Sequence, residues 1–296
     1  MNRATVIATY SRRMRLRLDS GREVDARIKG KRLKPVCGDV VEVEPIDNEH
    51  DWLINTITPR RNELTRPNMR GQVEVLAANL DYLLVVAAAE PTADWFIVDR
   101  YLCAAELMGI DAGIIYNKID LDYEVPVYEL DVYADIGYDV VGCSAESGAR
   151  IEAVRELLTD HCAIIVGQSG VGKSSIINCL LGDDVQRTAT ISDKSREGRH
   201  TTVNSVMIPL PAGGAIIDSP GVRDYAPALE SSTIASQGFR EIRAAAQECR
   251  FANCRHLREP GCAVKDGCES GRISPRRYES YKRIVNLTEQ LAEGRY

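Results

Sequence analysis

The stretch that decides the fold lies in the middle of the chain and matches the phosphate-loop pattern G-x-x-x-x-G-K-[ST]: Gly167-Gln168-Ser169-Gly170-Val171-Gly172-Lys173-Ser174. An apolar run at 163–166 precedes it, as expected of a buried strand, and an apolar pattern at helical spacing follows at 175–181. Glycines let backbone N–H groups approach phosphate oxygens, and the helix N-terminus adds a positive dipole end. We therefore predict that this loop and Ser175 bind a nucleotide, with Lys173 on the β- and γ-phosphates and Ser174 on Mg²⁺.

Length and composition limit the class of protein. The 296 residues allow two or three domains, and a hydrophobic content of 44% supports real cores. The longest apolar run, residues 83–89, is too short to span a membrane, and the first residues lack the apolar core of a signal peptide. We expect a cytoplasmic monomer without a membrane partner, in which nine cysteines are free thiols or metal ligands.

The net charge of −6 is spread unevenly along the chain. Residues 1–34 carry a local charge of +8, residues 35–239 one of −18, and residues 240–296 one of +4. An acidic middle between basic ends favours contact of the ends with a polyanion. For residues 1–34 we favour nucleic acid over a merely solvated charged face.

The pattern of apolar residues divides the chain into three domains. Residues 1–68 alternate polar and apolar in short segments separated by turns, which predicts a small β-barrel of the OB-fold type that binds RNA. Residues 69–226 alternate strands and helices, which predicts an α/β domain with a parallel sheet covered on both faces. Residues 227–296 form a third, partly helical and partly basic domain.

A second motif indicates which nucleotide is bound. Asn117-Lys118-Ile119-Asp120 follows a strand and matches N-K-x-D, the loop with which GTPases read guanine. Asp120 can accept from both N1–H and the N2 amine, a pair of donors that adenine lacks, while Asn117 bonds the other edge and the Lys118 stem packs over the ring. Ser144 and Ala145 follow the next strand, where a second guanine-contacting loop would lie.

Between the phosphate loop and a later D-x-x-G motif lie the residues expected to respond to the γ-phosphate. Asp218 and Gly221 supply a carboxylate near Mg²⁺ and an N–H to the γ-phosphate. Thr201 or Thr202 completes the Mg²⁺ shell, and we prefer Thr202. Val222 stands where Ras-like enzymes carry the glutamine that orients the attacking water. We therefore assign His200 as a catalytic residue, in addition to Lys173. The alternative is that His200 only helps to fix its loop.

The order of these motifs differs from that of an ordinary GTPase, in which the phosphate loop comes first. Here Asn117 and Ser144 precede Gly167. The sequence therefore predicts a circularly permuted GTPase domain, in which the chain leaves Gly221 and passes directly into the C-terminal domain.

Four residues in the C-terminal domain have the spacing of a zinc site, C-x₄-C-x-H-x₅-C: Cys249, Cys254, His256 and Cys262. Three thiolates and one imidazole make a closed tetrahedral zinc site, and we expect one structural Zn²⁺ per chain. Cys268 is a fifth candidate that could replace Cys262. The remaining cysteines are interpreted as buried thiols.

Together these motifs resemble those of one bacterial GTPase family, the RsgA or YjeQ family. The permuted order, the Gly-Arg-His-Thr-Thr loop at 198–202, Asp-Ser-Pro-Gly at 218–221 and the cysteine cluster carry the resemblance, which covers essentially the whole chain. It implies an N-terminal OB-fold, a permuted GTPase domain and a zinc domain. It also implies action late in 30S subunit maturation, near the decoding region of 16S rRNA, with GTP hydrolysis stimulated by the subunit. Glu197 and Cys268 depart from the family pattern outside the motif residues.

Three functions are weighed. The first is a ribosome-assembly GTPase with Zn²⁺ and Mg²⁺ as cofactors, whose partners are the 30S subunit, 16S rRNA, GTP or GDP, and other assembly factors. The second is a GTP-dependent RNA-binding switch with little turnover of its own. The third is an ATP-dependent enzyme with structural zinc, against which Asp120 argues because adenine lacks the donors that it would accept.

Overall fold

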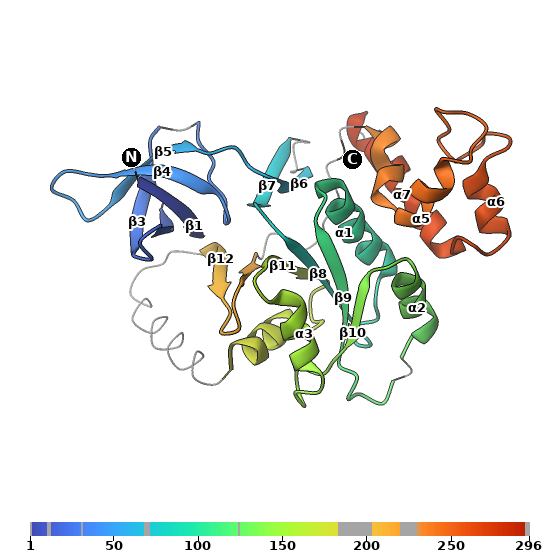
Figure 1. Cartoon of the computed structure of the whole chain (residues 1–296), viewed down its shortest axis with the longest axis horizontal. Coiled ribbons are helices and arrows are strands. Elements are labelled where there is room, and N and C mark those ends of the chain that lie inside the picture. Colours follow the sequence, from blue (N-terminus) through green and yellow to red (C-terminus); the bar gives the residue numbers. More distant parts are fainter. Residues whose placement is uncertain are drawn as a thin grey trace.

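The three predicted parts of the chain lie side by side in the computed structural model, which describes residues 2–10, 13–30, 32–67, 72–123, 125–182, 203–219, 229 and 231–293. Figure 1 shows the N-terminal barrel at the left, the central α/β sheet in the middle and the C-terminal helices at the right. His200, Thr201, Thr202 and Gly221 lie outside the described residues.

The N-terminal part is a closed five-stranded barrel with strand order β1-β2-β3-β5-β4, closed by pairing of β1 with β4. Its strands are β1 (Asn2–Tyr10), β2 (Met14–Leu18), β3 (Glu23–Ile28), β4 (Val40–Pro45) and β5 (Trp52–Ile57). Alternate residues of each strand point inward, so that Val6, Leu16, Val41 and Ile54 are buried in one apolar core. This is the architecture that the period-two pattern of the sequence predicts.

The middle of the chain builds a sheet in which β10, β9, β8, β11 and β13 are parallel neighbours. The strands are β8 (Tyr82–Ala88), β9 (Asp111–Asn117), β10 (Asp139–Gly142), β11 (Cys162–Gly167), β12 (Val203–Pro209) and β13 (Ala215–Asp218). A separate hairpin pairs β6 (Glu63–Pro67) with β7 (Val73–Ala78) and lies between the barrel and this sheet (Figure 1).

Helices cover both faces of the parallel sheet. Successive strand residues point to opposite sides, so these apolar strands present side chains to be buried on each face. Leu83 and Val85 face α1 (Trp95–Met108) and α2 (Val127–Asp135) in one core. Leu84 and Val86 face α3 (Ile151–Leu158) and the helix at residues 173–182 in the other. The near-continuous apolar strands of this region are those expected of a sheet buried on both faces.

Strand β1 belongs to the barrel and to the central sheet at the same time. Its first half pairs with β4, whereas Ala8, Thr9 and Tyr10 pair antiparallel with β12. Strand β12 also pairs with β13, so one sheet of eleven strands runs from β10 into the barrel. The barrel is therefore joined to the nucleotide domain by backbone hydrogen bonds as well as by the chain itself.

Helix α1 connects the central sheet to the C-terminal domain. The Asp94 carboxylate caps its N-terminus by accepting from the backbone N–H groups of Phe96 and Ile97, and Gly109 ends it in the left-handed conformation. One side of the helix packs on the sheet, while Cys103 of the same helix is buried among the apolar residues of the C-terminal domain.

The C-terminal domain contains four short or medium helical segments in its described part. They are a 3₁₀ helix at Ser232–Gly238, α5 (Arg240–Ala246), α6 (Ala263–Glu269) and α7 (Pro275–Ala292). Pro275 stands in the first turn of α7, where its missing N–H costs nothing. None of the helices in the described part of the chain combines the length and the apolarity that a membrane crossing needs.

A buried ion network joins this domain to α1. Arg277 and Asp99 both have fully buried side chains, and Arg277 Nη1 donates to Asp99 Oδ1 at 2.7 Å. The same guanidinium donates to both carboxylate oxygens of Glu241 at 2.8 and 3.0 Å. Arg276 and the Tyr133 hydroxyl also donate to Asp99. Burial lowers the pKa of Arg277, but the two carboxylates hold it well above its ordinary value.

Removing Arg277 should weaken the contact between the C-terminal domain and α1, because buried Asp99 and partly buried Glu241 would lose the cation that they share, and Asp99 would keep only Arg276 and the Tyr133 hydroxyl. We expect Arg277→Ala to destabilise this interface by about 3–5 kcal/mol. Urea unfolding with hydrogen exchange of α1 and α7 measures the effect. The control Arg272→Ala removes an exposed arginine near the same helix and should leave both measurements unchanged. Equal protection in Arg277→Ala and the parent would contradict the assignment.

Candidate nucleotide and metal sites

The phosphate loop leaves the carboxyl end of β11, between β8 and β13. Gly167 has φ +136°, and a Cβ there would lie 2.2 Å from the carbonyl oxygen of Val86. Gly172 has φ +94°, and a Cβ there would lie 2.3 Å from Nδ2 of Asn117. Any larger residue at either position would displace a neighbouring strand or the guanine-reading motif, so the glycines of the motif are required by packing as well as by phosphate access.

The helix at residues 173–182 begins directly after the loop, so that its N-terminus points at the loop interior. Lys173 Nζ donates to the carbonyl oxygens of Gly167 and Gln168 at 2.7 and 2.6 Å. The ammonium group is therefore held over the loop that the sequence assigns to phosphate. Ser174 and Ser175 are exposed at the start of the same helix.

The N-K-x-D motif at the end of β9 is bonded directly to the phosphate loop. Asn117 is buried, and its Nδ2 donates to the carbonyl oxygen of Val171 at 2.9 Å. Lys118 Nζ donates to the carbonyl oxygen of Gly170 at 2.9 Å and to that of Glu90. Lys118 takes a left-handed backbone with φ +66°. Asp120, two residues further, is exposed.

The second loop assigned to guanine also meets Asn117. The backbone N–H of Ala145 donates to Asn117 Oδ1 at 3.0 Å. Ser144 is buried, and its hydroxyl accepts from the N–H of Ser147 at 3.0 Å, which closes the turn after β10. One asparagine side chain therefore links three loops that are separated in the sequence by up to 54 residues.

Asp218 ends β13 and is half-buried. Since β13 runs parallel to β11, the carboxyl end of β13 lies at the same edge of the sheet as the phosphate loop. Beside Asp218, the hydroxyl of Ser219 accepts from that of Ser205 at 2.9 Å, which ties the start of the D-x-x-G motif to β12.

The loop that follows β8 contributes contacts that the sequence analysis did not assign. Besides the Glu90 carbonyl, Gln168 Oε1 accepts from the backbone N–H of Asp94 at 2.9 Å. Pro91 lies against Gly170, where a Cβ would be 3.4 Å from the Pro91 ring. These contacts join the phosphate loop to the N-terminus of α1. These contacts could not be predicted from the sequence, because they involve backbone carbonyl and N–H groups, which every residue type has.

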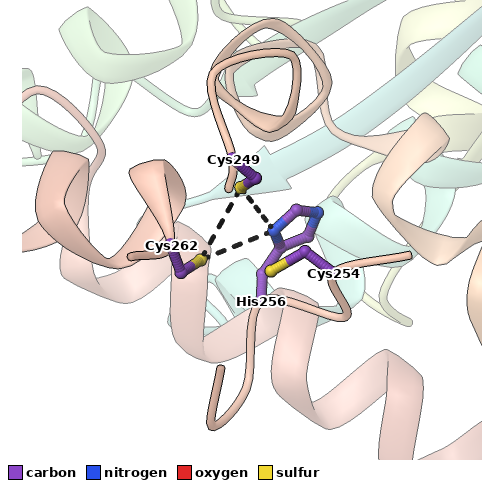
Figure 2. Close-up of side chains that lie close together, drawn as sticks. All are labelled: Cys249, Cys254, His256 and Cys262. Carbon is purple, nitrogen blue, oxygen red and sulfur yellow. Dashed lines mark hydrogen bonds between the residues drawn. The ribbon is translucent and has the colours of Figure 1, made fainter. Parts of the chain in front are cut away.

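The four predicted zinc ligands converge in the C-terminal domain, as Figure 2 shows. Their ligand atoms all lie within 4.8 Å of one another. Cys249 Sγ is 4.0 Å from Cys262 Sγ, and His256 Nδ1 is 3.5 and 3.6 Å from these two sulfurs. A tetrahedral Zn²⁺ with its usual bond lengths requires S···S edges of about 3.8 Å and S···N edges of about 3.5 Å. The donor set therefore has the size of a tetrahedral zinc site.

The backbone around these ligands is held by side chains outside the cluster. Tyr278 and Tyr281 of α7 donate their hydroxyls to the carbonyl oxygens of His256 and Arg255, each at 2.6 Å. The Glu259 carboxylate accepts from three backbone N–H groups of its own turn. Burial would raise the pKa of Glu259, but these N–H groups lower it to about 2.

Burial shifts the pKa values of three of the four ligands, His256, Cys254 and Cys262, and it raises that of the Cys262 thiol. Desolvation lowers the pKa of His256, which favours the neutral imidazole that a metal needs. Desolvation also raises the pKa of the Cys254 thiol to about 12. Only a bound cation would compensate the burial of thiolates at this position. In the described part of the chain, Cys268 is outside the cluster of ligand atoms.

Comparison with known proteins agrees with this geometry. The family model for RsgA GTPase matches residues 57–227, which is more than half of the chain. The small ribosomal subunit biogenesis GTPase RsgA of Haemophilus influenzae is 39% identical over 248 residues, covering 82% of this chain and 72% of that protein. The protein of the same name from Actinobacillus pleuropneumoniae is 41% identical over 249 residues, with the same coverage.

The chain belongs to the RsgA GTPase family.

Solved structures show the same fold over almost the whole length. The crystal structure of YjeQ from Thermotoga maritima matches with a TM-score of 0.76 at 27% identity, covering 97% of this chain and 98% of that one. The structure of YloQ, a circularly permuted GTPase, matches with a TM-score of 0.73 at 24% identity and supports the fold alone. The predicted fold class, a permuted GTPase domain between a barrel and a C-terminal domain with a Cys/His cluster that could hold a metal, is confirmed.

The family assignment does not test the role of each site residue. The structure brings together the phosphate loop, Asn117, Lys118, Ser144 and Ala145, and it places Asp218 at the same edge of the sheet. Their contacts with nucleotide stay predictions, as do those of His200, Thr201, Thr202 and Gly221, which lie outside the described residues.

Nucleotide choice should depend on Asp120. We expect Asp120→Asn to weaken GTP binding by about tenfold to a hundredfold, because a charged acceptor for two base donors is replaced by an amide. Binding of xanthosine triphosphate should improve, since its base offers an acceptor where guanine has the amine. A competition assay with both nucleotides measures the change, and Asp122→Asn is the matched control. An unchanged preference for GTP in Asp120→Asn would refute the assignment.

Proposed function

We propose that this GTPase acts in late maturation of the small ribosomal subunit, where it binds 16S rRNA near the decoding region. The observation that carries the nucleotide part is the bonding of Asn117 and Lys118 to the phosphate loop, which sets a guanine-reading loop beside a phosphate site. The ribosomal part is carried by relatives that are 39% and 41% identical over 82% of this chain and are named small ribosomal subunit biogenesis GTPases.

The following residues are proposed to contact GTP and Mg²⁺. Asn117 has a second N–H beyond the one given to Val171, and it is available to the base. Asp120 accepts from the guanine donors. Lys173 moves from the carbonyl oxygens of its own loop to the phosphates when these arrive, because a phosphate is a stronger partner than a peptide carbonyl. Mg²⁺ enters with GTP, and Ser174, Thr202 and Asp218 are the oxygen donors near it.

The barrel is the proposed RNA-binding part. Several of its arginines are already paired: Arg15 and Arg17 with Glu23, and Arg27 with Glu49 and Asp51. In the described part of residues 1–34, the exposed basic side chains outside such pairs include Arg22, Lys29, Arg32 and Lys34. The last three lie in the β3–β4 connection, and we assign the phosphate contacts to this connection.

Domain boundaries at 68/69 and 226/227 are part of the proposal. The first falls between the paired strands β6 and β7, so the hairpin they form is the bridge between the barrel and the GTPase domain. The protein is proposed to work as a cytoplasmic monomer alongside other assembly factors on the same particle.

Zinc in the C-terminal domain is proposed as structural. We expect about one Zn²⁺ per chain, and we expect Cys254→Ser to lose it, because three ligands hold zinc far less tightly than four. Hydrogen exchange over residues 231–293 should then increase, while GTP binding is retained. Elemental analysis of protein purified without chelators measures the metal. Cys268→Ser is the matched control and should keep its zinc; loss of zinc from Cys268→Ser alone would overturn the ligand set.

Hydrolysis should depend on His200. Val222 cannot orient water, so we expect slow turnover alone and strong stimulation when the subunit orders the loop that carries His200. His200→Ala should bind GTP and 30S subunits normally yet lose stimulated turnover by about a hundredfold. The control His50→Ala removes an exposed histidine of the barrel. Full stimulation in His200→Ala would contradict this role, and weakened binding together with turnover would assign His200 to fixing its loop instead.

The rate of GTP hydrolysis, measured with and without 30S subunits, also distinguishes a ribosome-assembly GTPase from the alternative function. A GTP-dependent RNA-binding switch would show negligible hydrolysis in both conditions.

A further inference from the structure

Exposed apolar side chains gather in one short part of the chain. In the described residues, seven large hydrophobic side chains are exposed, and five of them lie between positions 121 and 128. Their exposed fractions are 37% for Leu121, 54% for Tyr123, 37% for Val125, 57% for Val127 and 69% for Tyr128. This segment runs from the N-K-x-D motif into α2. Such a concentration of apolar surface indicates an interaction site.

The same segment is strongly acidic. Residues 119–149 contain eight Asp and Glu and no Lys, Arg or His. Asp120, Asp122, Asp131 and Asp135 are exposed there. A surface of this charge repels the phosphates of RNA. The charge therefore selects a positively charged partner.

Each of the two exposed tyrosines lines a cavity. A cavity of about 310 Å³ lies between Tyr123, Pro126, Tyr116 and Trp95, just before the start of α2. A second cavity of about 390 Å³, between α2 and the C-terminal domain, is lined by Tyr128, Asp135, Arg240 and Arg272 among others. The guanidinium of Arg240 is already paired with Glu106, and Arg272 donates to the Ser270 hydroxyl. Apolar side chains of a partner would thus find one recess beside Tyr123 and another beside Tyr128.

We propose that residues 120–123 and 125–135 form a docking surface for a lysine- and arginine-rich segment of another protein. The carboxylates pair with the cationic head groups, the faces of Tyr123 and Tyr128 attract the same cations, and the aliphatic side chains pack against the Lys and Arg stems. The inference rests on the proposed function only in the choice of particle for its second test.

The first test measures binding of a defined probe by fluorescence anisotropy. The probe is a labelled twelve-residue peptide of four Arg-Leu-Lys repeats, compared with a Glu-Leu-Glu peptide and a twelve-nucleotide single-stranded RNA. We expect Tyr123→Ser with Tyr128→Ser to weaken binding of the basic peptide about fivefold or more, although it leaves the charge unchanged. Asp122→Asn with Asp131→Asn should have a similar effect.

The matched control, Asp19→Asn with Asp47→Asn, removes two exposed acids from the barrel and changes the net charge equally. It should leave the affinity of the basic peptide within about twofold. Equal affinities for all three variants would overturn the proposal, because binding would then be only a general effect of net charge. Weakened binding of the RNA probe in the tyrosine variant would overturn it as well, since the surface would then be an RNA site. Thermal melts verify that each variant is folded.

The second test uses full-length protein on purified 30S subunits, with a benzoylphenylalanine photocrosslinker in place of Tyr128 or, for comparison, of Phe251. We expect the probe at position 128 to crosslink to a Lys- and Arg-rich peptide of a protein in the particle, identified by mass spectrometry. The proposal would be overturned if protein that sediments with the subunit crosslinks only to RNA or to a second copy of the chain. It would also be overturned if such protein forms no crosslink. Failure of the parent chain to sediment would count against the proposed function, and the peptide assay would then decide the inference.

Discussion

The hydrogen bonds that Asn117 and Lys118 make to the phosphate loop are the constraint on which the nucleotide site depends. Asn117 donates to the carbonyl oxygen of Val171 and Lys118 to that of Gly170, so the N-K-x-D motif and the G-x-x-x-x-G-K-S loop are held as one unit. These bonds can form whichever of the two motifs comes first in the sequence. A permuted chain can build the same site because the carboxyl ends of β9 and β11 still meet at one edge of the sheet.

Permutation changes what the site is connected to. Strand β12 lies between the phosphate loop and Asp218 in the sequence, and it pairs with β1 of the barrel. On the other side, Asp99 of α1 shares a buried ion network with α5 and α7. The nucleotide domain is thus bonded to an RNA-binding candidate through a strand and to the metal domain through buried charge. A nucleotide-dependent change near β12 therefore has a direct route to the barrel.

Sequence patterns predicted the local features well and the long-range ones poorly. The G-x-x-x-x-G-K-S loop, the strands around it and the convergence of the four Cys and His side chains follow from residue type and spacing, which are local properties. The pairing of β1 with β12 escaped prediction because it joins residues nearly 200 positions apart, and strand periodicity does not name a partner. Asp99 and Arg277 escaped because charged residues on a helix ordinarily face solvent, and only the packing of two domains buries them. That the Lys118 stem packs over the base ring stays a prediction, and the contacts of its ammonium group with the Glu90 and Gly170 carbonyl oxygens were not anticipated.

We propose that GTP at the permuted site controls attachment of this protein to the small ribosomal subunit. Sedimentation with purified 30S and 70S particles, in the presence of GDP or of a non-hydrolysable GTP analogue, measures this attachment. We expect the protein to pellet with 30S subunits when the analogue is bound, and much less with GDP or with 70S ribosomes. Equal pelleting in both nucleotides, or none with 30S subunits, would show that GTP does not control attachment.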